Sequence, residues 1–144
     1  MRTITLLIIH CSGVRPYQSS TAQQIDSWHR TRGWKGIGYH YVVLRDGTIQ
    51  TGRPESQIGA HCAGHNDHSI GICYEGGLDV NGQPKDTRTR AQKRAMRRLL
   101  RGLMQRYPQA FIMGHNALNP RKSCPCFNAA DDYKELRSIT PIDL

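Results

Sequence analysis

The chain has 144 residues, of which 38% are hydrophobic and 22% are charged, and its formal net charge is +9. This length and composition are typical of a single soluble globular domain over residues 1–144, and they exclude a fibrous or low-complexity protein. The apolar run Leu6 to Ile9 is far too short for a transmembrane helix. The positive charge favours an anionic partner, for which nucleic acid, an anionic wall polymer and a membrane surface are all candidates.

The number of cysteines and the N-terminal region indicate in which cellular compartment the protein is expected. The chain has five cysteines, and an odd number argues against a disulfide framework, so free thiols or metal ligands are expected. No small-residue cleavage site follows the first apolar run, so the pattern of a signal peptide is missing. We therefore expect a protein that is made in the cytoplasm and stays there until it is released. We also expect it to be a monomer.

The first predicted elements are a buried strand and a helix. The β-branched and apolar run Thr3 to Ile9 predicts a strand that is buried on both faces and ends at His10. The next periodic segment predicts a helix with Ser20 as its N-cap and Gln23 completing a capping box. Gly33 is the expected end of this helix.

The remaining elements follow in the order strand, strand, strand, helix, strand, helix. Asp46-Gly47 predicts a hairpin between the first two of these strands. The predicted strands are 39–44, 48–51, 69–74 and 111–113, and the predicted helices are 90–107 and 128–136. This order predicts an α/β fold with a single mixed central β-sheet flanked by helices.

Three potential metal ligands stand at or after predicted strand ends. His10 follows the first strand, His115 follows the last, and Cys124 lies in the segment GHNALNPRKSCPC (114–126), predicted to be neither helix nor strand. Histidine and cysteine are usual zinc ligands, and a catalytic zinc site combines three protein ligands with one open position. The three side chains would meet only if both strands end at the same place. Spacing alone therefore leaves a structural or surface role open for each histidine.

Five ordered motifs carry a family resemblance over residues 8–127: IIHCSGVRPYQ, WHRTRGW, GYHYVVLRDGTI, GAHCAGHNDHSIGICYEGG and HNALNPRKSCP. Together they resemble the zinc-dependent N-acetylmuramoyl-L-alanine amidases, and most of all the phage-lysozyme type. That family is related to the peptidoglycan recognition proteins, so the resemblance also implies their type of fold. The spacing departs slightly from the family pattern in the last motif.

The resemblance implies a role for five residues. His10, His115 and Cys124 match the three zinc ligands of the family, in which many bacterial members have aspartate at the third position. Tyr39 matches the tyrosine beside the metal, and Lys122 matches the lysine two residues before the last ligand. Lys122 would place a positive charge near the developing oxyanion. Tyr39 would donate a hydrogen bond to that oxyanion or orient the attacking water.

Other histidines and cysteines have weaker signals. His61 matches a histidine that lines the substrate groove of the family, although a surface loop position is equally open. His40 is a second substrate-binding candidate, but a core histidine with satisfied hydrogen bonds is the favoured interpretation because Tyr39 and His40 point to opposite faces. Cys126 is the rival of Cys124, and the resemblance favours Cys124 because the family ligand precedes proline.

The resemblance implies a zinc-dependent peptidoglycan hydrolase that cleaves the amide bond between N-acetylmuramic acid and L-alanine of the stem peptide, as an endolysin does. Its partner would be the muramyl peptides of the wall, with no specific nucleic acid and no membrane span. One alternative is a peptidoglycan-binding module without turnover, against which the intact Tyr39 and Lys122 argue. Another is an amidase that also regulates a phage RNA polymerase.

The predicted helix 90–107 is strongly basic on the faces away from its apolar stripe. A solvated charged face is the default interpretation, and attraction to an anionic wall polymer or phospholipid comes next. Nucleic-acid binding ranks third because interleaved aromatic residues and a recognition fold are missing. The basic residues are Arg90, Lys93, Arg94, Arg97, Arg98 and Arg101.

Overall fold

A computed structural model describes residues 2–137 and contains one mixed sheet with the strand order β3-β2-β4-β1-β5. Strand β1 runs parallel to both of its neighbours, β4 and β5, while β2 is parallel to β4 and antiparallel to β3. The predicted fold class is therefore confirmed. The strands are β1 (Leu6–Cys11), β2 (Tyr41–Val43), β3 (Ile49–Thr51), β4 (Ser69–Tyr74) and β5 (Phe111–Gly114).

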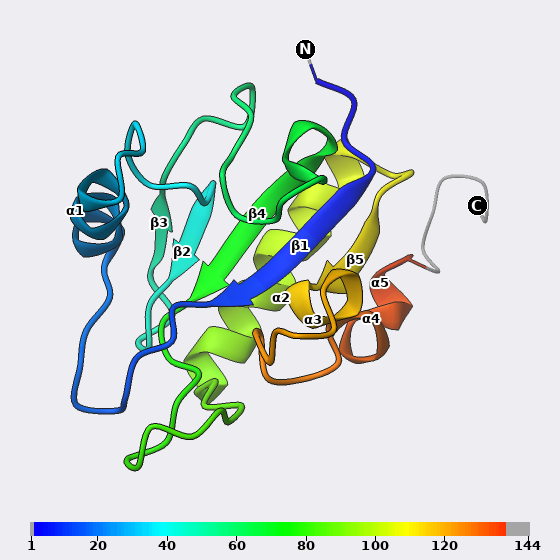
Figure 1. The fold of residues 1–144 in the computed structure, drawn as a ribbon. Coiled ribbons are helices and arrows are strands. Elements are labelled where there is room, and N and C mark those ends of the chain that lie inside the picture. Colours follow the sequence, from blue (N-terminus) through cyan, green and yellow to red (C-terminus); the bar gives the residue numbers. More distant parts are fainter. Residues whose placement is uncertain (1, 138–144) are drawn as a thin grey trace.

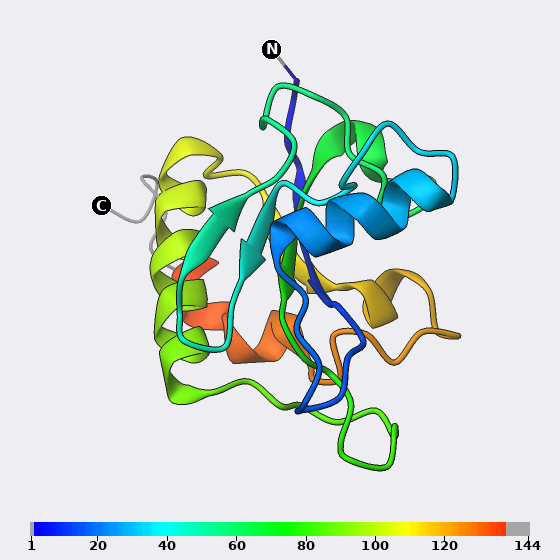
Figure 2. The same cartoon turned by 90° about the vertical axis from the view of Figure 1, so that its left-hand side faces the viewer.

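Helices cover both faces of the sheet (Figures 1 and 2). One face packs against α2 (Arg90–Arg106), α4 (Ala129–Asp132) and α5 (Lys134–Arg137), and the other lies beneath α1 (Ala22–Thr31) and α3 (His115–Leu118). Side chains alternate along a strand. Leu7 and Ile9 of β1 accordingly join the larger core under α2, while His10 points toward the side of α1 and α3.

Helix α1 begins one residue later than the sequence predicts. Thr21, not Ser20, is its N-cap: Thr21 Oγ1 accepts a hydrogen bond from the amide of Gln24 at 3.2 Å, and Gln24 Oε1 accepts one from the amide of Thr21 at 2.8 Å. The predicted capping box with Ser20 and Gln23 is thus wrong by one position. Ser20 has another role, because its amide donates to the buried Glu75 carboxylate at 2.7 Å.

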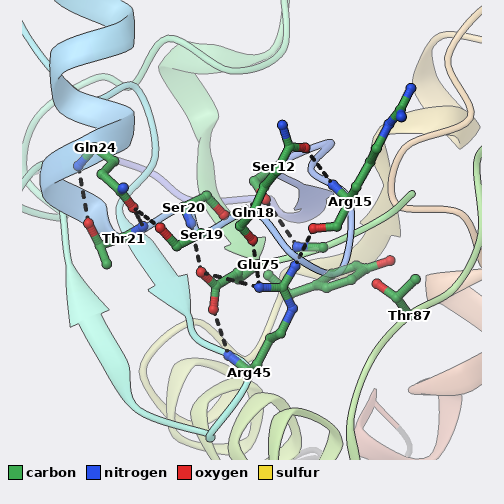
Figure 3. A network of polar contacts seen from close by, with 12 residues as sticks. Ser12, Arg15, Gln18, Ser19, Ser20, Thr21, Gln24, Arg45, Glu75 and Thr87 are labelled. Carbon is green, nitrogen blue, oxygen red and sulfur yellow. Dashed lines mark hydrogen bonds and ion pairs between the residues drawn. The ribbon is translucent and has the colours of Figure 1, made fainter. Parts of the chain in front are cut away.

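Glu75 follows β4 and holds two loops to the sheet (Figure 3). Its second oxygen, Oε1, accepts a hydrogen bond from the amide of Arg45 at 3.0 Å, in the turn between β2 and β3. Ser20 Oγ donates to Ser12 Oγ at 2.7 Å, which ties the segment before α1 to the residue that follows β1. This network fixes the chain where β1 and β4 end.

Helix α2 is the longest helix and closes the larger core. Thr89 caps it through a capping box with Gln92. Nε2 of the Gln92 side chain also donates to the carbonyl oxygens of Val43, at the end of β2, and of Glu75, just after β4. Met96, Leu100 and Leu103 are fully buried against the sheet. No helix within residues 2–137 combines the length and the apolar character of a membrane span.

Two segments differ from the predicted pattern near the C-terminal end. The predicted loop after β5 begins with the single helical turn α3, and the amide of Asn119 donates to the carbonyl of His115 at 2.9 Å. The predicted helix 128–136 is divided into α4 and α5. Asn128 caps α4 as expected, but Tyr133 interrupts the helix and packs its ring into the core.

Candidate functional site

The two histidines of the predicted ligand set come from neighbouring parallel strands. His10 is the fifth residue of β1 and is buried, while His115 is the first residue after β5. Ile9 lies opposite Gly114 in the pairing of these strands, so the residues that follow each of them are also adjacent. The two imidazole ring centroids are 4.7 Å apart.

Cys124 completes a cluster with these two histidines. Its sulfur accepts a hydrogen bond from the backbone amide of Cys11 at 3.1 Å, which holds the loop after α3 against the end of β1. One ligand atom from each of His10, His115 and Cys124 lies within 4.8 Å of the others. The structure therefore brings together the three residues that the resemblance implies as zinc ligands.

The donor set fits a zinc ion. Burial, together with the nearby His61 and His115, holds the pKa of His10 well below its usual value, and burial followed by the charge of Lys122 lowers the pKa of His115. Both rings are therefore neutral at pH 7, with a nitrogen lone pair available for a metal. Two neutral imidazoles and one thiolate are borderline-soft ligands of the kind zinc prefers.

His61 contacts the cluster directly. His10 Nε2 and His61 Nδ1 share a hydrogen bond of 2.8 Å, and His61 Nε2 lies 3.2 Å from Ser69 Oγ. A Cβ atom at Gly71 would come within 2.7 Å of the His61 ring, so this glycine makes room for the imidazole. His61 is thus a fixed neighbour of His10 rather than a residue of a loose surface loop.

Tyr39 and Lys122 line the same pocket as the cluster. The Tyr39 ring centroid is 5.1 Å from that of His10, and burial raises the pKa of Tyr39 well above its usual value, so the side chain is a neutral phenol at pH 7. Lys122 is exposed at the mouth, and its backbone amide donates to the carbonyl of Asn119 at 3.0 Å. A hydrogen-bond donor and a positive charge therefore flank the three potential ligands.

His40 occupies a different place from the other predicted site residues. Its ring is buried, Nδ1 accepts a hydrogen bond from the amide of Gly71 at 3.0 Å, and Nε2 lies 2.8 Å from the carbonyl oxygen of Gln57. His40 is not one of the residues that line the pocket. This environment supports the core interpretation over substrate contact.

Cys126 lies outside the cluster of potential ligands. Its sulfur is 4.0 Å from the sulfur of Cys11 and 3.4 Å from the carbonyl oxygen of Gly77. The hydrogen bond with Cys11 and burial both raise the pKa of the Cys126 thiol. Of the two thiols in Cys-Pro-Cys, Cys124 is the one near both histidines.

The pocket around the cluster has a volume of about 590 Å³, and one of its walls was not predicted from the sequence. This wall is formed by Arg32 and Trp34 after α1, with the buried His29 behind them at a ring distance of 4.5 Å from Trp34. Arg32 and Trp34 do lie in the motif WHRTRGW. Their proximity to the three potential ligands depends on tertiary packing, so no periodicity could have revealed it.

Comparisons with known proteins identify the family of the chain. A family model described as N-acetylmuramoyl-L-alanine amidase matches residues 1–127. The chain belongs to the N-acetylmuramoyl-L-alanine amidase family. This membership confirms the resemblance, the enzyme class and the peptidoglycan hydrolase function that the sequence predicted.

Relatives of this amidase include phage endolysins and peptidoglycan-recognition proteins. The endolysin of Escherichia phage T7 is 38% identical over 134 residues, which is 93% of this chain and 88% of the relative. The solved endolysin LysCS from Clostridium intestinale is 31% identical with a TM-score of 0.78, over 95% of this chain and 83% of that chain. A mutant of Drosophila PGRP-LB in complex with tracheal cytotoxin is 26% identical with a TM-score of 0.75, over 92% and 80% of the two chains.

Proposed function

We propose that His10, His115 and Cys124 hold one zinc ion, at which this amidase cleaves the bond between N-acetylmuramic acid and L-alanine. The observation that carries the proposal is the convergence of the three ligand atoms within 4.8 Å of one another, in a pocket that also contains Tyr39 and Lys122. When bound, the ion would polarise the scissile carbonyl and lower the pKa of water at the site.

The residues around the cluster would position the substrate and stabilise charge. The neutral Tyr39 phenol would donate a hydrogen bond to the oxygen on which negative charge develops, and the Lys122 ammonium would add a positive charge on the same side. The Tyr39 ring is packed against the rings of His10 and His29 before substrate arrives, so it needs little reorganisation in the transition state.

His61 would act through His10. With His10 Nε2 engaged by His61, Nδ1 is the nitrogen left for the metal ion. A hydrogen bond to the second nitrogen of a ligating histidine fixes the tautomer and the orientation of the ring. His61 is therefore proposed as a positioning residue, while His40 supports the sheet from within the core.

The proposed substrate is a muramyl peptide of peptidoglycan. The complex of the Drosophila PGRP-LB mutant with tracheal cytotoxin supports this class of ligand for the family groove. The pocket volume is in the range of sites that enclose small molecules. The Arg32 and Trp34 wall supplies a cation and an exposed aromatic ring beside the cluster.

Release of stem peptides from purified peptidoglycan tests the proposal. We expect the untreated enzyme to release them, a chelator to stop release, and added zinc to restore it. A chelator-resistant release would contradict the metal assignment. Binding to peptidoglycan without any release would instead support the module that has lost turnover.

A further inference from the structure

The outer side of helix α2 is a cationic surface that the amidase reaction does not use. The helix carries seven arginine or lysine residues and no aspartate or glutamate. Within residues 2–137, Arg97 pairs with Glu135 and Arg106 pairs with Glu55. The other five are exposed and make no side-chain hydrogen bond or ion pair with the described chain: Arg90, Lys93, Arg94, Arg98 and Arg101, together called the α2 strip.

The α2 strip covers one side of a rigidly packed helix. At 3.6 residues per turn its side chains leave the helix within an arc of about 140° and over a length of about 16 Å. A separate arc, next to that of Lys93, carries the buried Met96, Leu100 and Leu103, which fix the helix to the sheet. The large hydrophobic side chains that are exposed in the described chain all lie outside α2. The surface therefore offers charge without apolar anchors.

The α2 strip and the pocket lie on opposite sides of the molecule. Figure 2 shows α2 on one side of the sheet, with α1 and α3 on the other. The pocket is lined by residues of α3 and by residues that follow α1, such as Arg32 and Lys122. A muramyl peptide held in the pocket would leave the α2 strip free to meet a second anionic partner.

We propose that the α2 strip docks this amidase onto a surface of anionic phospholipid headgroups, with the pocket facing away from the lipid. A band of cations along one side of a packed helix is complementary in charge to a layer of phosphate groups. Peptidoglycan lies on the outer side of such a membrane, so a released enzyme that docks on that side in this orientation would face its substrate. Since basic residues near an anionic membrane contribute about fivefold each to affinity, five of them support a measurable interaction.

The lack of apolar anchors determines the character of this binding. Adsorption is electrostatic and reversible, so the protein lies on the headgroups and inserts no side chain into the acyl region. Binding should therefore weaken sharply when the salt concentration rises from about 0.05 M to about 0.5 M, because the screening length falls well below the size of the α2 strip.

Sedimentation of the full chain with lipid vesicles tests the proposal. We expect binding to vesicles of phosphatidylcholine mixed with phosphatidylglycerol, and none to phosphatidylcholine alone. The double variant Arg94→Glu/Arg98→Glu should lose at least about tenfold in affinity, since it removes two cations and adds two anions. Its release of stem peptides from soluble peptidoglycan fragments should equal that of the wild type.

A charge-matched control separates the α2 strip from net charge. Lys35→Glu/Lys85→Glu makes the same change at two exposed lysines outside α2 and should keep the wild-type affinity. Equal losses in the two double variants would overturn the proposal, as would binding to neutral vesicles. Duplex DNA that competes with the lipid on equal terms would show a general polyanion site and would also overturn it.

Discussion

His10 and His61 share a hydrogen bond of 2.8 Å. We expect the affinity for zinc to depend on this contact. We expect His61→Ala to weaken zinc binding by about tenfold to a hundredfold, because the His10 ring loses the partner that orients it. His61→Gln can still accept a hydrogen bond and should recover part of the loss. Competition with a chromophoric chelator measures the affinity. His65→Ala is the control on the same loop, and an unchanged affinity in His61→Ala would refute the positioning role.

The Lys122 side chain should affect the turnover of the enzyme and not the binding of zinc. Lys122 and His115 line the same pocket, and the charge of Lys122 adds to burial in lowering the pKa of His115, but Lys122 offers no ligand atom to the cluster. Lys122→Ala should retain zinc and lose a factor of about 100 to 1,000 in turnover, which is typical for a lost oxyanion donor. Turnover is followed by stem-peptide release, and metal by mass spectrometry. A rate equal to that of the wild type would remove Lys122 from the mechanism.

His29 predicts a pH dependence of folding stability. Its Nδ1 accepts a hydrogen bond from the amide of Gly38 at 2.9 Å, and burial, followed by the charges of Arg32 and Arg53, lowers its pKa to about 4. The unfolded chain binds a proton near pH 6.5. The neutral ring therefore contributes full stability above that pH, and the contribution is lost as the pH falls toward 4.

Urea unfolding in the presence of a chelator measures this effect without the metal. Between pH 7.5 and pH 5 the wild type should lose about 2 kcal/mol more than His29→Asn, which keeps an acceptor near Nδ1 and does not titrate. The other histidines are the same in both proteins, so their contribution cancels. An identical pH dependence in the two proteins would contradict the assignment.

At the scale of elements, the Glu75 carboxylate connects the end of β4 with two loops. Replacing Glu75 by alanine leaves the buried amide of Ser20 and the part-buried amide of Arg45 without their acceptor. We expect a loss of about 2–4 kcal/mol in the free energy of unfolding, because each unpaired buried donor carries a desolvation cost. Glu75→Gln keeps one carbonyl acceptor and should lose less. Urea titration at pH 7 would contradict this account if Glu75→Ala were as stable as the wild type.

The hydrogen bonds of Glu75 also explain why the predicted start of α1 is wrong by one residue. Ser20 and Thr21 are both good N-cap residues, and each is followed three residues later by glutamine. Local sequence cannot choose between them. The choice is made by Glu75, which is distant in sequence and accepts the amide of Ser20. Elements whose pattern is long and periodic, such as α2 and β4, were predicted to within one residue.

At the scale of the whole molecule, the sequence predicted the sheet but not the distances within the site. In the sequence, the first predicted strand ends at His10, and the last one is followed by Gly114 and His115. These positions predicted where functional side chains leave the sheet. That His10 and His115 are neighbours follows from the parallel pairing of β1 and β5, which no local pattern encodes. The wall formed by Arg32 and Trp34, and the contact of His61 with His10, likewise depend on segments far apart in the chain.

The proposed function depends on the binding of one zinc ion by His10, His115 and Cys124 together. Metal analysis of the untagged protein, compared with Cys124→Ser and Cys126→Ser, measures this binding. We predict about one zinc per chain in the wild type and in Cys126→Ser, and almost none in Cys124→Ser. A wild type without zinc after purification with the metal present, or equal loss of zinc in the two variants, would contradict the claim.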